Sequence, residues 1–437
     1  MVSYYLRLAW LSVKKTPVLS ALMVLAIAMG IAACLTTLTL YQVVSSNPLA
    51  DKNAVTFAVQ LDSWDPNEDY WAVNGVPEQL TYQDAKAIYR TGNADQTVLT
   101  SRIGVTVEAT DASTPPKVED ARLATRDFFS VFDVPFRYGG PWSATADAHG
   151  EQQVVISTAL QHHFFAGEYP VGKSVMVEGE VYTIVGVMDE RWTMTPSVYD
   201  LNTGAFKEPP QLFLPFFNVE RRPFASWGNV VGWKNEDVRS HQDFLATEMA
   251  WVQTWVSLNT PEARAEFEQF LVNYIHNEKQ KGRFERPLKY YLNTPEQWLS
   301  INGVVSRDNR ILVYLSLAFL AVCLVNAVVL LLAKFLRKAP EAGLRRALGA
   351  SRAAVFVQHL AEAAVIGALG SALGLLLSWF GLVGVRSLYS HYQEVAVMSG
   401  FTVIAALVFA LVSALVSGAL PAWQVSRSQP ARYLKAQ

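Results

Sequence analysis

Cysteine is scarce in this chain, which has two in 437 residues. Both of them, Cys34 and Cys323, lie inside long apolar segments, and the polar region between those segments, residues 45–310, contains none. That region therefore has neither disulfides nor a thiolate metal site. It is long enough to bury a hydrophobic core without such links.

Charged residues are missing from four apolar segments, residues 18–44, 311–332, 363–385 and 401–420. The hydrocarbon core of a bilayer is roughly 30 Å thick, and a helix needs about 20 apolar residues to cross it. All four segments reach that length. The sequence therefore predicts four transmembrane helices, one before the polar region and three after it.

The charges that remain are separated by sign along the chain. Residues 46–310 carry 35 acidic and 23 basic side chains, a net charge of −12, whereas the rest of the chain carries 3 acidic and 13 basic ones, a net charge of +10. An excess of Lys and Arg beside span ends marks the cytoplasmic face of a membrane. We therefore expect a bacterial inner-membrane protein with both termini in the cytoplasm and the acidic domain in the periplasm.

The expected segments are, in order, a cytoplasmic segment 1–17, a span 18–44, an outer domain 45–310, a span 311–332, a cytoplasmic loop 333–362, a span 363–385, an outer loop 386–400, a span 401–420 and a cytoplasmic tail 421–437.

The outer domain has the patterns of both strands and helices. Residues 55–61 alternate between apolar and polar side chains over most of their length, which predicts a half-buried strand. Strands and helices on both sides of an aromatic, proline-rich middle, residues 192–255, favour a mixed α/β domain of two lobes rather than one sheet. Further expected elements are a helix 158–165 capped by Ser157, a hairpin of 174–177 with 181–187, a helix begun by Thr260 and Pro261, and a helix begun by the capping box of Thr294 and Gln297 that leads to the second span.

Residues 167–174 match the phosphate-loop pattern G-x-x-x-x-G-K-S. A phosphate loop needs a strand before it and a helix after it, because the N–H groups of the helix N-terminus face the phosphates. The expected order here is the reverse, and the charge layout places the segment outside the cytoplasm. We therefore interpret Lys173 as a turn residue rather than as part of an ATP site.

No group of residues in the sequence forms a recognisable active site. His162 and His163 are adjacent, so on a helix they point about 100° apart and do not share a metal. The patterns G-x-S-x-G and H-E-x-x-H are absent. We expect no catalytic, metal-binding or cofactor-binding residue and no contact with nucleic acid. Most of the tryptophans in the outer domain are expected in its core, the alternative being an apolar binding surface.

The segment 334–352, between the second and third spans, has the pattern of a short basic amphipathic helix closed by Gly349. Two interpretations fit such a helix. Its basic residues could hold it on anionic lipid, or it could dock onto a cytoplasmic partner protein.

Three parts of the sequence resemble the MacB/FtsX-like permeases, the type VII family of ABC transporters. The pattern E-x-G-L-R-R-A-L-G-A at 341–350 is similar to the family's cytoplasmic loop, and the ending P-A…Q-P-A-R-Y-L at 421–434 is similar to its C-terminus. Residues 124–129, 154–157 and 167–173 resemble the family's periplasmic core domain, which accounts for the phosphate-loop match without ATP.

This resemblance implies a permease subunit that pairs with a second copy or a sibling permease and binds a separate cytoplasmic ABC ATPase. ATP and magnesium would bind that ATPase and not this chain. The outer domain would consist of a porter-like and a small α/β subdomain. Closure of the ATPase would move this domain through the spans (mechanotransmission), and cargo already outside the membrane would be exported or extracted without a pore between the spans.

The resemblance also implies which residues contact the ATPase, although Ala342 stands where the family usually has a larger aliphatic residue. A proline, Pro340, also precedes the glutamate of the motif, and both departures weaken the expected docking. The implied coupling residues are Glu341, Gly343, Leu344, Arg345, Arg346, Ala347, Leu348, Gly349 and Ala350.

The spans contain small and polar residues suited to helix packing. Gly370, Gly374 and Ser378 recur at every fourth position of the third span, which allows close helix contact within the bundle or in a dimer. Asn326 is the one strongly polar residue midway along the second span, and its amide is expected to find a partner across a helix interface. Spans without central charges favour transmission of motion over a solute channel.

Three functions remain open. The chain could be an export permease that works with an ATPase and a periplasmic adaptor, an FtsX-like regulator that activates a periplasmic enzyme, or a permease that extracts lipoproteins or lipids. FtsX-like regulators usually have much smaller outer domains, so the length of residues 45–310 favours export or extraction.

Overall fold

The computed structural model describes residues 2–111, 114–304, 307–388 and 400–427. Its contacts divide the chain into two units. Residues Met1–Ser45 and Ser306–Gln437 form the helical unit, and Ser46–Val305 form the α/β unit.

The helical unit contains long helices at the positions of the four expected spans. Three of its described helices are long and apolar enough to cross a membrane, namely α2, α10 and α12. The helix α13 covers the fourth expected segment, whose crossing stays a prediction. The helices of this unit are α1 (Val2–Lys15), α2 (Pro17–Ser45), α10 (Arg307–Arg337), α11 (Ala339–Ala347), α12 (Arg352–Leu388) and α13 (Gly400–Ser426).

These helices run past the ends of the apolar segments that predicted them. Helix α10 continues to Arg337 and α12 already begins at Arg352, so the loop expected over 333–362 is itself mostly helical. The apolar length of a segment marks the bilayer, whereas the backbone hydrogen bonds of a helix continue through polar residues. Most of the expected outer loop, residues 389–399, and the tail from residue 428 lie outside the described residues.

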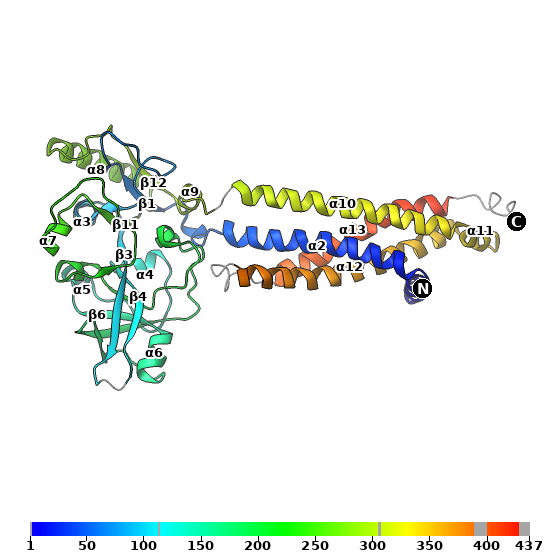
Figure 1. Cartoon of the computed structure of the whole chain (residues 1–437), viewed down its shortest axis with the longest axis horizontal. Helices are drawn as coiled ribbons and strands as arrows, with labels where there is room; N and C mark the ends of the chain where they lie inside the picture. Colours follow the sequence, from blue (N-terminus) through cyan, green and yellow to red (C-terminus); the bar gives the residue numbers. More distant parts are fainter. Residues whose placement is uncertain (1, 112–113, 305–306, 389–399, 428–437) are drawn as a thin grey trace. The chain divides into compact units, whose positions relative to one another are not determined.

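Glycines let the helices of this unit approach one another closely. A Cβ atom added at Gly30 of α2 would lie 2.9 Å from Leu320 Cδ1 on α10, and one at Gly370 of α12 would lie 2.8 Å from Ile27 Cγ2 on α2. Helix α2 therefore packs against both α10 and α12 with little space between the backbones (Figure 1).

The α/β unit is built around one mixed sheet of twelve strands. The strand order is β12-β1-β11-β3-β4-β9-β6-β8-β5, with β2 on β11, β10 on β3, and β7 on both β3 and β8. Two neighbouring pairs, β4–β9 and β6–β8, are parallel, and the other pairs are antiparallel. The strands are β1 (Thr56–Leu61), β2 (Leu80–Thr81), β3 (Gln96–Ala109), β4 (Lys117–Ala124), β5 (Phe136–Gly139), β6 (Gln153–Ser157), β7 (Ser174–Val177), β8 (Glu180–Met188), β9 (Leu212–Pro215), β10 (Ala225–Ser226), β11 (Ala250–Ser257) and β12 (Tyr290–Asn293).

Short helices surround this sheet. Figure 1 shows α3 and α8 near one end of the long strands β3 and β4, and α6 near the other. The α-helices are α3 (Tyr82–Thr91), α4 (Phe128–Val131), α5 (Ala144–His149), α6 (Thr158–Phe165), α7 (His241–Leu245), α8 (Pro261–Gln280) and α9 (Pro295–Ile301), and the 3-10 helices are η1 (Ala50–Lys52), η2 (Val198–Thr203) and η3 (Phe216–Glu220).

Both faces of the sheet are buried. Side chains point to opposite faces at successive positions of a strand, and Phe57 belongs to one hydrophobic cluster whereas Ala58 belongs to a second one. The first cluster includes Leu271 of α8, and the second includes Trp298 of α9. Each face therefore has its own core.

This arrangement corrects two expectations. All six residues of β1 are buried, so the prediction of a half-buried strand is wrong. Its polar Gln60 is accommodated because its amide nitrogen donates to the Pro77 carbonyl at 3.0 Å and its amide oxygen accepts from Asn293. The expectation of more than one sheet is also wrong, because the ladders join all twelve strands. The division into two lobes, a porter-like and a small α/β subdomain, stays a prediction.

Local capping signals predicted the helices well. Ser157 accepts the Leu160 N–H at the start of α6, Thr260 caps α8, and Thr294 and Gln297 form the predicted capping box of α9. The predicted hairpin is confirmed as the pair β7–β8. The expectation that the capping box begins the helix to the second span is wrong, because α9 ends at Ile301 and α10 is a separate helix.

The phosphate-loop match has the order of elements that the sequence predicted. Helix α6 precedes it and strand β7 follows it, and Gly167 and Gly172 have positive φ angles of 82° and 87°. Lys173 Nζ lies 2.9 Å from Glu168 Oε2. The lysine thus pairs within its own turn, and no helix N-terminus follows it to face a phosphate.

Candidate functional site

The loop helix α11 is closed at its C-terminal end by Gly349, as the sequence predicted. The Gly349 N–H donates to the Arg346 carbonyl at 3.1 Å, and the Ala350 N–H donates to the Arg345 carbonyl at 3.0 Å. These two bonds form a Schellman motif. Its left-handed position is occupied by Gly349, with a φ of 101°, which an L side chain rarely adopts.

One face of α11 is uncovered and carries two leucines. Leu344 is 55% exposed and Leu348 is 81% exposed, and the charged Glu341 and Arg345 beside them are exposed as well. Residues three and four positions apart share one side of a helix. The four side chains therefore form a mixed surface, which we call the leucine face of α11.

The opposite side of α11 packs against the helical unit. Ala339, Ala342 and Gly343 are buried. From the edge of the leucine face, Arg345 Nη1 donates to Gln358 Oε1 on α12 at 2.7 Å, and Arg346 Nη1 donates to the Ser426 carbonyl on α13 at 3.3 Å. The two arginines of the motif thus fasten α11 to two neighbouring helices. Ala347 and Leu348 are exposed, and the helix is fixed in place without them.

A buried cluster of charges lies at the base of this loop, and the sequence analysis missed it. Lys334 Nζ on α10 is 2.7 Å from Glu362 Oε1 on α12, with side-chain exposures of 1% and 4%. Lys334 also donates to Ser20 Oγ on α2 at 2.9 Å. Lys338 Nζ lies 3.4 Å from the same Glu362 oxygen, and Ser12 on α1 donates to it. We call these five side chains the Glu362 cluster.

The Glu362 cluster joins α1, α10 and α12 at one carboxylate, and α2 through Lys334. A buried charge is tolerated only when it is paired and hydrogen-bonded, because its desolvation costs several kcal/mol. The Phe335 and His359 rings pack beside it with their centroids 4.6 Å apart. The sequence did show two charged residues at the ends of neighbouring spans, but their separation along the chain gave no sign that they meet.

Three of the four predicted packing residues contact another helix of the chain, and the fourth, Asn326, is exposed. Gly370 and Gly374 lie against Ile27 and Ile31 of α2, and Ser378 Oγ is 3.2 Å from Thr36 Oγ1. These three residues therefore serve contacts within the chain. Asn326 is exposed on α10, and no partner for its amide occurs among the described residues, so a partner across an interface with another molecule stays a prediction.

Two family models cover most of the chain. The MacB-like periplasmic core domain matches residues 20–273, and the FtsX-like permease C-terminal domain matches residues 313–430. The second match includes α11 and three members of the Glu362 cluster, Lys334, Lys338 and Glu362.

Curated relatives match nearly the whole chain. The macrolide export ATP-binding/permease protein MacB of Salmonella typhi is 23% identical over 435 residues, which cover 97% of this chain and 58% of that protein. The protein of the same name from Acinetobacter baylyi is 22% identical over 307 residues, covering 70% of this chain and 41% of that protein. The chain thus spans 58% of the length of the first of these relatives.

Solved structures of related domains resemble this chain in part. The periplasmic region of MacB from Actinobacillus actinomycetemcomitans covers 57% of this chain and 95% of that one, with 11% identity and a TM-score of 0.35. The extracellular domain of the noncanonic ABC-type transporter YknZ from Gram-positive bacteria covers 54% and 98%, with 12% identity and a TM-score of 0.33.

Proposed function

Because this chain belongs to the family of MacB/FtsX-like permeases, we propose that it is the permease subunit of an ABC transporter. A separate cytoplasmic ATPase would bind α11, and ATP-driven closure of that ATPase would move the extracytoplasmic α/β unit through the spans. The transporter would drive export of a substrate that is already outside the inner membrane. The name of the MacB relatives, which refers to macrolide export, supports this direction.

The leucine face of α11 is the observation that carries the proposal. Exposed leucines beside charged residues are typical of protein contact surfaces, because burying each leucine stabilises a complex by about 1.5–3 kcal/mol. Leu344 and Leu348 are available for such a contact, since α11 is held by its other side. The remaining partners, a second permease and a periplasmic adaptor, rest on the family resemblance.

The Glu362 cluster supports the transmission step. A force applied to α11 reaches α10 through the chain itself, and the cluster then connects α10 to α1, α2 and α12 by ion pairs and hydrogen bonds. Close packing of α2 against α10 and α12 extends this connection along the helices. Helices coupled in this way would move together rather than open a channel between them.

Removal of the leucine face tests the docking directly. In the variant Leu344→Ser with Leu348→Ser, we expect co-purification with the ATPase to fall by roughly tenfold or more, because two apolar contacts are lost. Both side chains are exposed, so the fold of the permease should be unaffected. Leu288→Ser, at an equally exposed leucine of the α/β unit, is the matched control and should co-purify normally. Unchanged co-purification of the double variant would overturn the assignment of α11 as the docking helix.

A further inference from the structure

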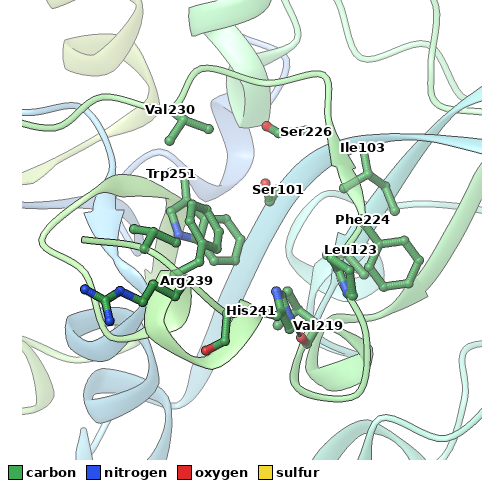
Figure 2. Close-up of a pocket in the computed structure, with 14 residues that line it drawn as sticks. Ser101, Ile103, Leu123, Val219, Phe224, Ser226, Val230, Arg239, His241 and Trp251 are labelled. Carbon is green, nitrogen blue, oxygen red and sulfur yellow. Dashed lines mark hydrogen bonds between the residues drawn. The ribbon is translucent and has the colours of Figure 1, made fainter. Parts of the chain in front are cut away.

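An open cavity of about 460 Å³ lies within the α/β unit. It is lined by Ser101 and Ile103 of β3, Leu123 of β4, Phe224 and Trp251, which Figure 2 labels, and by Phe244. Trp251 lies on one side, opposite Phe224, Leu123 and Ile103. Cavities that bind small molecules have volumes of roughly 300–1,000 Å³ and predominantly apolar, aromatic linings with a few polar groups.

The aromatic side chains along one wall are stacked. The rings of Phe244 and Trp251 are 5.7 Å apart between centroids at an angle of 24°, and those of His241 and Phe244 are 6.4 Å apart at 20°. Aromatic rings prefer offset stacked or edge-to-face contacts. A flat ring can therefore extend this stack or meet it edge-on.

Three polar groups in the lining have unused hydrogen-bonding capacity: Ser101, His241 and the buried Trp251 Nε1, which has no hydrogen-bond partner among the described residues. Ser101 is only 4% exposed, and its hydroxyl has no hydrogen-bond partner in the part of the chain that the structure describes. His241 Nε2 lies 2.5 Å from the Val219 carbonyl, so Nε2 carries the proton and the other nitrogen, Nδ1, is an acceptor in the neutral ring. A buried N–H without a partner, such as that of Trp251 Nε1, is unfavourable, and an oxygen atom of a ligand would relieve this.

The charge at the cavity is already neutralised. Arg239 is the one charged residue of the lining, and its Nε donates to Asp237 at 2.8 Å. The lining therefore offers an ionic ligand only one charge, which is paired and faces solvent, and a charged group deeper in the cavity would lose its hydration without compensation.

We propose that this cavity binds a small, flat, uncharged aromatic molecule that carries a hydroxyl group. Its ring contacts the wall of Phe244 and Trp251, and its hydroxyl exchanges hydrogen bonds with Ser101. The site goes beyond the coupling function and does not depend on it, because none of its residues belongs to α11 or the Glu362 cluster.

Photochemical labelling of the full chain in lipid nanodiscs tests the site. The probe is 4-hydroxybenzophenone, which carries the flat phenol ring that the cavity would recognise and a photoreactive ketone that labels nearby C–H groups. Labelled peptides are identified by mass spectrometry. We expect saturable labelling of the peptides that contain residues 219–251. Labelling confined to the helices of the helical unit would overturn the proposal, since it would mean that the probe only dissolves in the bilayer.

Two variants with matched controls establish where the probe binds. Val238→Trp fills the cavity from its rim, where Val238 is 40% exposed, and should reduce the labelling of residues 219–251 by roughly tenfold. Ser101→Ala removes one hydrogen bond and should raise the probe concentration at half-saturation by roughly fivefold. The controls Val118→Trp and Ser197→Ala lie outside the lining and should label as the unmodified chain does. Unchanged labelling in Val238→Trp would contradict the proposal. An unchanged half-saturating concentration in Ser101→Ala would overturn the assignment of Ser101 as the residue that binds the ligand's hydroxyl group.

Discussion

At the scale of single residues, Glu362 makes the contacts on which the proposed transmission depends most. Its carboxylate is paired with Lys334 of α10 and with Lys338, and accepts a hydrogen bond from Ser12 of α1. Lys334 in turn donates to Ser20 of α2, so three helices besides its own meet at or near one group. Removing one member of a buried ion pair costs about 3–5 kcal/mol, because the other charge stays buried without compensation.

Neutralising Glu362 should therefore destabilise the helical unit. We expect Glu362→Gln to lower the free energy of unfolding by about 3–5 kcal/mol, measured by thermal unfolding in nanodiscs. Glu341→Gln, on the exposed side of α11, is the control and should change stability by less than about 0.5 kcal/mol.

Exchanging the two charges distinguishes an ion pair from packing alone. The double variant Lys334→Glu with Glu362→Lys keeps both charges in the buried pair, and it should recover part of the stability lost in Glu362→Gln. A double variant that is less stable than the single one would show that the pairing does not hold these helices together.

The residue scale is also where the sequence was least informative. The Schellman closure at Gly349 was predictable because its signal is local, a glycine at the end of a short amphipathic pattern. The Lys334–Glu362 pair was not, because it depends on the packing of α10 against α12. The uncovered Leu344 and Leu348 follow from the same packing, which decides the side of α11 that is buried.

At the scale of elements, the close approach of α12 to α2 depends on the absence of side chains at specific positions. A Cβ atom at Gly374 would lie 3.0 Å from Ile31 Cβ and 3.1 Å from the Ala28 carbonyl, whereas one at Gly384 of the same helix would meet nothing within 4 Å. The two glycines thus have the same chemistry in different surroundings.

A leucine at these two positions should have different effects. We expect Gly374→Leu to destabilise the helical unit by about 1–3 kcal/mol, since overpacking forces the two helices apart, and Gly384→Leu to have little effect. Thermal unfolding of both variants in nanodiscs measures the difference. Equal melting temperatures would mean that α2 and α12 are not held in close contact at Gly374.

In the α/β unit, the starts of the helices could be predicted from the sequence, whereas the burial of the strand β1 could not. Thr260, Ser157 and Thr294 act on N–H groups of their own helices, so the starts of α8, α6 and α9 could be inferred from neighbouring residues. The burial of β1 could not, because the second face of this strand is covered by residues such as Trp298, far along the chain.

At the scale of the whole molecule, the distribution of apolar and charged residues predicted the division into two units. Its one-plus-three arrangement of apolar segments matches the helical unit of Met1–Ser45 with Ser306–Gln437, and the acidic region matches the α/β unit. The family models match these same regions, with the periplasmic core domain over 20–273 and the permease domain over 313–430. The distribution of apolar and charged residues along the chain thus predicted the architecture, and the short motifs indicated the family.

The central claim is that α11 contacts the ATPase, and site-specific cross-linking in cells tests it most directly. The photoreactive residue p-benzoylphenylalanine is placed at position 348, on the leucine face of α11, and at position 288, in the α/β unit, as the control. The account predicts that position 348 cross-links to an ABC ATPase identified by mass spectrometry and that position 288 does not. An ATPase cross-link from position 288, or none from position 348, would contradict it.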